Sequence, residues 1–212
     1  NARFALLLLL VVILSGCGSA KYGRDALLSK DIGEYYKAIE KLRKATRKEK
    51  DREKRMLYAF EIAECYRYIC DYERAELYYK NAIRRGYKDN IALLHHADML
   101  RATQQYEESI ETYRTYLDSV PGDERALIGL ESIRLTQEWV ANPTRHIVNP
   151  IKEINSIESD YSPVFVADRD NEIIFTSSRK SVTGKRSSEI TGQGYTDLFR
   201  STFGVQKQKW EK

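Results

Sequence analysis

The stretch GEYYKAI at residues 33–39 returns as CDYERAE at 70–76 and as QQYEESI at 104–110. In each copy an aromatic residue is followed, three positions later, by a small one. The aromatic residues are Tyr35, Tyr72 and Tyr106, and the small ones are Ala38, Ala75 and Ser109. The second and third copies lie 34 residues apart, whereas the first and second lie 37 apart, because a charged loop between them is three residues longer. Repetition at such a period predicts a solenoid of stacked helix pairs.

This pattern resembles the tetratricopeptide repeat, whose first helix carries a small residue that lets the second helix pack closely. The residues at that place are Ala26, Ala63 and Ala97, and further matches are Tyr66, Tyr79, Ala82 and Pro121. The resemblance implies an α-helical tetratricopeptide-repeat domain over 17–141, with about three repeats and a capping helix at 125–137. It also implies a concave face that binds a peptide or a domain of another protein.

In this family the first helix of each repeat lines the binding groove. Carried over onto the middle and third copies, the groove residues are Leu57, Phe60, Glu64, Arg67, Tyr68, Ile91, Leu94, Asp98 and Arg101. Aromatic and aliphatic side chains among paired charges suit an amphipathic segment of a partner protein. The alternative is that about half of these side chains pack against neighbouring helices instead.

The front of the chain carries the pattern of a lipid-anchored secreted protein. Residues 4–14 are apolar and uncharged, which is too short for a membrane-spanning helix and typical of a secretory signal. The following Leu14-Ser15-Gly16-Cys17 resembles the bacterial lipobox, which implies removal of residues 1–16 and acyl chains such as palmitate on Cys17. Such chains hold a protein at a membrane. The alternative is an ordinary signal peptide cut near an unrelated cysteine. Because the sequence starts at Asn1 without Met, we also expect the open reading frame to begin earlier.

The charge of the chain is nearly balanced, at 35 basic and 31 acidic side chains, so no overall field favours nucleic acid. Residues 41–55 are an exception, with nine basic and three acidic side chains. This basic run could contact the phosphates of lipid A or an acidic partner, since it lies close in sequence to Cys17. The alternative is a solvated helix end and loop.

Neither histidines nor cysteines form a recognisable reactive set. His95, His96 and His146 show no metal-ligand spacing, and adjacent histidines point to different sides of a helix. We expect Cys65 and Cys70 to be buried and unpaired, because five residues along one helix separate them too far for a disulfide. The alternative is a disulfide between them, which a turn near Cys70 would permit. The sequence also lacks a phosphate loop and a nucleophile elbow, so we expect no catalytic site, no metal and no cofactor.

The composition changes at two Asn-Pro pairs, 142–143 and 149–150, because proline disfavours helix in the residue before it. We therefore expect a linker over 142–158. Beyond it, SPVFVAD at 162–168 and EIIFTSSR at 172–179 predict a β-hairpin with its turn at 169–171, and TDLFRS at 196–201 predicts a third strand.

The amino-acid sequences of these strands resemble the WD-like propeller repeat of periplasmic proteins. The resemblance implies that residues 159–212 are the first blade of an all-β propeller. A propeller needs about four to eight blades, so we expect further blades beyond Lys212.

A lipobox, helical repeats and a propeller in this order resemble the OmpA-family lipoproteins of Bacteroidetes, which include the PorE-like component of type IX secretion. The resemblance implies a non-enzymatic scaffold in the periplasmic leaflet of the outer membrane, which links secretion or gliding machinery to peptidoglycan through an OmpA-like domain absent here. Two alternatives stay open. One is a helical-repeat lipoprotein of outer-membrane assembly or nutrient uptake, and the other is an enzyme whose site lies in further propeller blades.

Overall fold

The computed structural model describes residues 21–184 and 186–211. The predicted signal segment and the predicted lipidation site, Cys17, lie outside these residues. The described chain divides into two compact units. The helical unit holds the residues up to Pro143 together with Glu189–Thr191, and the strand unit holds Thr144–Ser188 and the residues from Gly192 onward. None of the described helices is long and apolar enough to cross a membrane.

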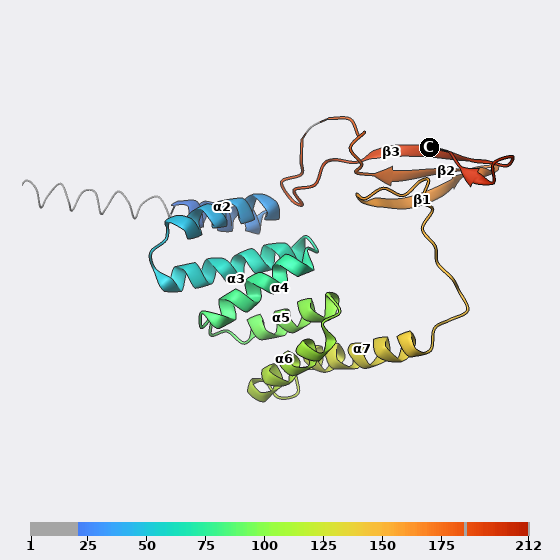
Figure 1. The fold of residues 1–212 in the computed structure, drawn as a ribbon. Helices are drawn as coiled ribbons and strands as arrows, with labels where there is room; N and C mark the ends of the chain where they lie inside the picture. Colours follow the sequence, from blue (N-terminus) through green and yellow to red (C-terminus); the bar gives the residue numbers. More distant parts are fainter. Residues whose placement is uncertain (1–20, 185, 212) are drawn as a thin grey trace, which may run out of the picture. The chain divides into compact units, whose positions relative to one another are not determined.

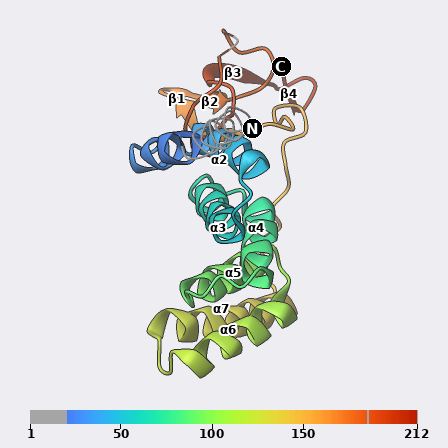
Figure 2. The ribbon, with the colours of Figure 1, turned by 90° about the vertical axis from the view of Figure 1, so that its left-hand side faces the viewer.

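The helical unit contains a first helix over residues 21–31 and six that follow it. These are α2 (Tyr35–Lys48), α3 (Arg52–Tyr68), α4 (Tyr72–Arg84), α5 (Ile91–Ala102), α6 (Tyr106–Ser119) and α7 (Glu124–Ala141). Each helix packs against the next, and α5 also contacts α7. Figure 1 shows α2 to α6 stacked in chain order, and Figure 2 shows the same stack from the side. The described helices therefore form three antiparallel pairs and a capping helix, as the repeat predicts.

Local sequence fixes where these helices begin and turn. Asp51, Asp71 and Asp123 stand just before α3, α4 and α7, and each side chain accepts a hydrogen bond from a backbone N–H of the first turn. Within each repeat, the turn between the two helices needs one residue with positive φ. That residue is Gly33 at 82°, Cys70 at 60° and Gln104 at 63°. Only the first repeat uses glycine, which adopts this conformation without strain.

The turn conformation also explains why Cys70 is unpaired, as predicted, but not buried. Cys70 is free but exposed, because it lies in the left-handed turn beyond the packed part of α3. Cys65 is free and buried, as expected, and burial raises the pKa of its thiol to about 12. Neither thiol is paired.

The small residues of the repeat are the points of closest packing. Fully buried at 0% exposure are Ala26, Ala63, Ala97, Ala38, Ala75 and Ser109. Larger side chains fill the space between the helices, and Tyr79 and Tyr113 are also completely buried. The Ser109 hydroxyl donates a 2.8 Å hydrogen bond to the Ala97 carbonyl, so the polar member of the series is satisfied inside the core. The repeat prediction is thus confirmed at the residues that carry it.

The strand unit is a four-stranded antiparallel sheet in the order β1-β2-β3-β4. Its strands are β1 (Asp160–Val166), β2 (Arg169–Ser177), β3 (Asp197–Gly204) and β4 (Lys209–Trp210). The predicted turn at 169–171 is wrong. Val166 pairs with Arg169, so the turn is the two residues between them, and Asp168 takes a φ of 61°. Aspartate tolerates this conformation better than most residues, which is why the chain reverses there.

One side of the sheet carries the core of the strand unit. Ile173 and Phe175 of β2 are buried together with Ile154 from the segment before β1, and Phe199 packs against them. Several large apolar side chains stay exposed, among them Val164 and Phe165 of β1 and Leu198 of β3. The predicted strand at 196–201 is confirmed as β3, whereas β4 was not predicted.

Candidate functional site

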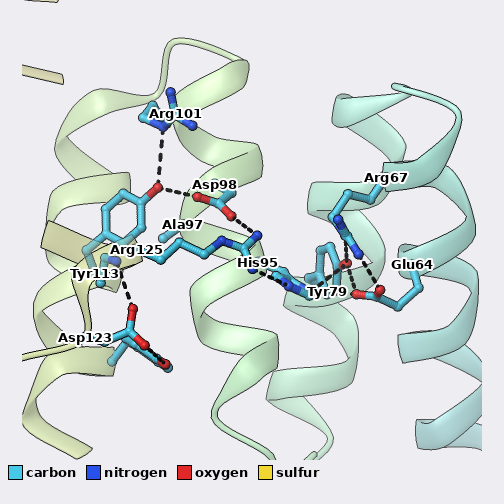
Figure 3. A network of polar contacts seen from close by, with 12 residues as sticks. Glu64, Arg67, Tyr79, His95, Ala97, Asp98, Arg101, Tyr113, Asp123 and Arg125 are labelled. Carbon is cyan, nitrogen blue, oxygen red and sulfur yellow. Dashed lines mark hydrogen bonds and ion pairs between the residues drawn. The ribbon is translucent and has the colours of Figure 1, made fainter. Parts of the chain in front are cut away.

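A buried carboxylate on α3 organises the middle repeat. Glu64 is 6% exposed, and its carboxylate accepts a 2.7 Å hydrogen bond from Arg67 Nη2 and one from the Tyr79 hydroxyl. His95 Nδ1 lies 2.6 Å from the same carboxylate. Arg67 Nε also donates to the Tyr79 oxygen at 3.2 Å. Figure 3 shows these side chains converging between α3, α4 and α5.

A second carboxylate repeats this arrangement one step along the solenoid. Asp98 on α5 accepts a 2.6 Å hydrogen bond from the Tyr113 hydroxyl, and Arg101 Nε donates to the Tyr113 oxygen at 3.4 Å. Arg125 on α7 donates to Asp98 at 2.7 Å, and its other terminal nitrogen lies 3.2 Å from His95 Nε2. His95 and Arg125 therefore join the two arrangements into one network, which we call the polar ladder (Figure 3).

The members of the polar ladder recur at the repeat period. An acid, an arginine three residues later and a tyrosine on the following helix stand 34 residues apart in the two copies. They are Glu64, Arg67 and Tyr79 in the middle repeat and Asp98, Arg101 and Tyr113 in the third. With the 37-residue offset, the first repeat has Leu27, Lys30 and Leu42 at these positions. The ladder therefore begins at the middle repeat.

The surroundings of Glu64 decide its protonation. Burial by itself would raise the pKa of the carboxyl, but the hydrogen bonds from His95, Arg67 and Tyr79 outweigh burial and lower the pKa to about 2. Burial raises the pKa of the Tyr79 and Tyr113 hydroxyls, and the neighbouring carboxylates raise it further. At neutral pH Glu64 is therefore ionised, and the Tyr79 and Tyr113 phenols are protonated.

The structure separates the predicted groove residues into two groups. Leu94 is 2% exposed and Phe60 is 8% exposed, and both belong to the hydrophobic core. Their placement corrects the expectation that they line an accessible groove, because the helix rotation turns them toward the second helices. Leu57 is 38% exposed and Tyr68 is 49% exposed, so both side chains lie at the surface. Ile91 is intermediate.

Of the remaining predicted residues, Glu64 is buried, and the other three line one hollow of about 390 Å³. Its lining includes Arg67, Asp98 and Arg101 from the predicted set, together with Tyr72, Met99, Ala102 and Arg125. Beside it, the Tyr68 ring stacks on Tyr35 with centroids 4.8 Å apart, and the Arg67 guanidinium lies 4.6 Å from the Tyr68 centroid. An exposed aromatic surface thus adjoins a hollow lined by three arginines and one acid.

Sequence reasoning missed four members of the ladder. Tyr79 was noted only as a match to the repeat, Tyr113 was not singled out, and His95 was considered only as a metal ligand. Arg125 was placed in the capping helix, although it stands 34 residues after Ile91 and so occupies a groove position of the next repeat. Extending the period into the capping helix would have found it. Among the described residues there is no group of histidines, cysteines and acids that could hold a metal ion.

Comparison with known proteins supports the helical fold. No family model and no curated protein matches the sequence. The C-terminal tetratricopeptide-repeat domain of an FK506-binding protein from Plasmodium falciparum aligns with a TM-score of 0.53 at 14% identity, over 60% of this chain and 93% of that one. The first such domain of Spaghetti, bound to the HSP90 peptide SRMEEVD, aligns with a TM-score of 0.50 at 17% identity, over 57% of this chain and 94% of that one. At these identities the likeness shows the fold alone, and the described helices form a tetratricopeptide-like repeat.

Proposed function

We propose that this chain is a protein-binding scaffold whose helical groove holds a segment of another protein. The observation that carries the proposal is the hollow of about 390 Å³ beside the exposed ring of Tyr68. Within residues 21–184 and 186–211, Arg101 makes no ion pair, and its one side-chain hydrogen bond is the long one to Tyr113. It is therefore free to bind a carboxylate of a partner, while Tyr68 covers an apolar side chain.

The likeness to the Spaghetti domain adds support of a weaker kind. That domain is bound to a short peptide of HSP90. A short segment of another protein is the same class of ligand that the groove of this chain fits. The geometry of the groove, and not the likeness, carries the proposal.

The test is crosslinking to a partner in native envelopes, with a photoreactive residue at position 57. Arg101→Ala and Tyr68→Ala should each weaken capture about thirtyfold, because buried arginine and aromatic anchors contribute about 2 kcal/mol each to an interface. The matched control is Arg114→Ala, since Arg114 is an exposed arginine on α6 outside the hollow. Equal capture by all three variants, with the melting temperature unchanged, would exclude the groove as the binding site.

We further propose that the scaffold is an outer-membrane lipoprotein of the type IX secretion or gliding machinery, anchored through Cys17 and facing the periplasm. The lipobox and the strand sequences support this, because both resemble the OmpA-family lipoproteins. The exposed apolar side chains of β1 and β3 support a propeller blade, since neighbouring blades would cover them. Peptidoglycan would then be reached through an OmpA-like domain of the longer protein.

The anchor has a direct test in a Gram-negative host. The natural chain should incorporate labelled palmitate and partition into detergent, and Cys17→Ser should do neither, because the thiol is the acceptor of the lipid. Cys70→Ser is the matched control, since Cys70 is exposed and free. Continued labelling of the Cys17→Ser protein would disprove the anchor without affecting the groove.

A further inference from the structure

Two neighbouring hollows lie on α2, α3 and α4, away from the residues of the polar ladder. Their volumes are about 250 and 260 Å³, and they share Arg43 and Arg47. The first is also lined by Lys44 and Arg74, and the second by Arg55. We call these five cationic side chains the α2 basic site. Four of the five come from the basic run at 41–55, whose role the groove does not explain.

The cations of the α2 basic site are largely without counterions. Arg74 pairs with Asp71 at 2.9 Å, and Glu40 is the one acid that lines either hollow. Throughout the described part of the chain, no ion pair engages Arg43, Lys44, Arg47 or Arg55. Like charges gathered without counterions repel one another, so an anion bound among them would relieve that repulsion.

A buried donor in the same place points to a missing acceptor. The Nε of Arg55 is buried and has no hydrogen-bond partner. Among the described residues it is the one buried side-chain nitrogen or oxygen without such a partner. Leaving such a donor unpaired costs free energy, so native structures rarely do it. Because Arg55 lines the second hollow, an acceptor oxygen bound there is the natural partner for its Nε.

The walls of the hollows add hydrogen-bond donors to the charge. The rings of Tyr66 and Tyr78 line the first and second hollow, with centroids 5.6 Å apart, and the Arg74 guanidinium lies 5.2 Å from the Tyr66 centroid. Burial raises the pKa of Tyr78, so its hydroxyl stays protonated. Guanidinium groups bind phosphate through two parallel hydrogen bonds, and a phosphomonoester brings nearly two negative charges to one place.

We propose that the α2 basic site binds a phosphate-bearing ligand, with a phosphomonoester or pyrophosphate group held by Arg43, Arg47 and Arg55. The proposal does not depend on the groove or on its partner. A lipid headgroup and a free phosphorylated molecule would present the same chemistry, so the experiment includes one arm for each source.

The first arm is calorimetric titration of the full chain with inorganic pyrophosphate at low salt. The natural protein should bind saturably, and Arg43→Gln with Arg47→Gln should weaken binding at least tenfold. The matched control is Arg84→Gln with Arg114→Gln, which removes the same charge from residues that line neither hollow and should leave binding within twofold. Arg55→Lys keeps the charge but removes the Nε, and it should weaken binding several-fold.

The second arm measures flotation with phosphatidylcholine vesicles that contain either phosphatidic acid or phosphatidylserine at equal charge. Preference for phosphatidic acid, lost in the Arg43→Gln/Arg47→Gln protein, would identify a lipid headgroup as the source. Saturable pyrophosphate binding without that preference would identify a free phosphorylated ligand. Absence of saturable binding in both arms would overturn the proposal, as would equal loss in the site and control variants.

Discussion

Replacing Glu64 with alanine should lower the free energy of unfolding of the helical unit by about 3–5 kcal/mol, the usual cost of removing one partner from a buried ion pair. The substitution removes the hydrogen-bond acceptor of the partly buried Arg67 guanidinium and of the buried Tyr79 hydroxyl. Urea denaturation of the full chain, followed by far-UV circular dichroism, measures the loss.

An exposed acid provides the matched control for Glu64. Glu131 pairs with Arg134 at 2.7 Å, but both side chains are more than half exposed. Glu131→Ala should therefore lower the free energy of unfolding far less than Glu64→Ala does. If the two substitutions cost the same, Glu64 does not organise the core of the solenoid.

Because the pKa of Glu64 is low, the pH dependence of stability provides a second test of the same prediction. The carboxyl has a pKa of about 2 in the folded protein against an ordinary value of 4.5. Its contribution to stability is therefore complete above pH 4.5 and is lost as the pH falls from 4.5 toward 2. Glu64→Gln cannot lose a proton at this position, so its stability should depend less on pH across that window than the stability of the natural protein. Parallel pH profiles for the two proteins would contradict the assigned pKa.

Replacing Phe60 with alanine should cost about 3–5 kcal/mol of unfolding free energy, because the substitution empties a packed aromatic position. The Phe60 ring stacks on Tyr87 with centroids 4.3 Å apart and meets the edge of Tyr79 at 5.9 Å. Differential scanning calorimetry of the full chain should show a melting temperature lowered by several degrees.

The matched control for Phe60 is Tyr68, an aromatic residue of the same helix. Tyr68 is half exposed, so Tyr68→Ala should change the melting temperature much less while it weakens partner capture. The opposite pattern, with Phe60→Ala stable but unable to capture a partner, would restore Phe60 to the groove.

The fold of the helical unit could be predicted from the sequence because its signal is local and repeated. A small residue at a fixed period marks where two helices touch, and Ala26, Ala63 and Ala97 are all fully buried. The groove could be predicted only in part. Phe60 and Leu94 are buried because of how their helices are rotated about their own axes. The sequence period alone does not fix that rotation.

The polar ladder was not predictable as a network for a related reason. Its hydrogen bonds join residues on five helices, from α3 to α7, and each residue type has an ordinary role when it is considered alone. Arg125 was not among the predicted groove residues because the groove positions were carried over onto the middle and third repeats only. The hairpin turn of the sheet was also not predicted correctly. It was expected to start at Arg169, but it starts two residues earlier, and Asp168 adopts positive φ there.

The polar ladder also bears on how the proposed groove would respond to a partner. A slide of α5 along α3 by one helical turn, about 5.4 Å, would carry His95 away from Glu64, which it now approaches to 2.6 Å. Such a shift would have to break several directional bonds together, whereas apolar packing alone would allow it to occur in small steps. The middle and third repeats therefore act as a rigid template. If the proposed partner segment binds there, the conformational entropy lost should fall mainly on that segment, and selectivity would come from how well it fits a shape already set.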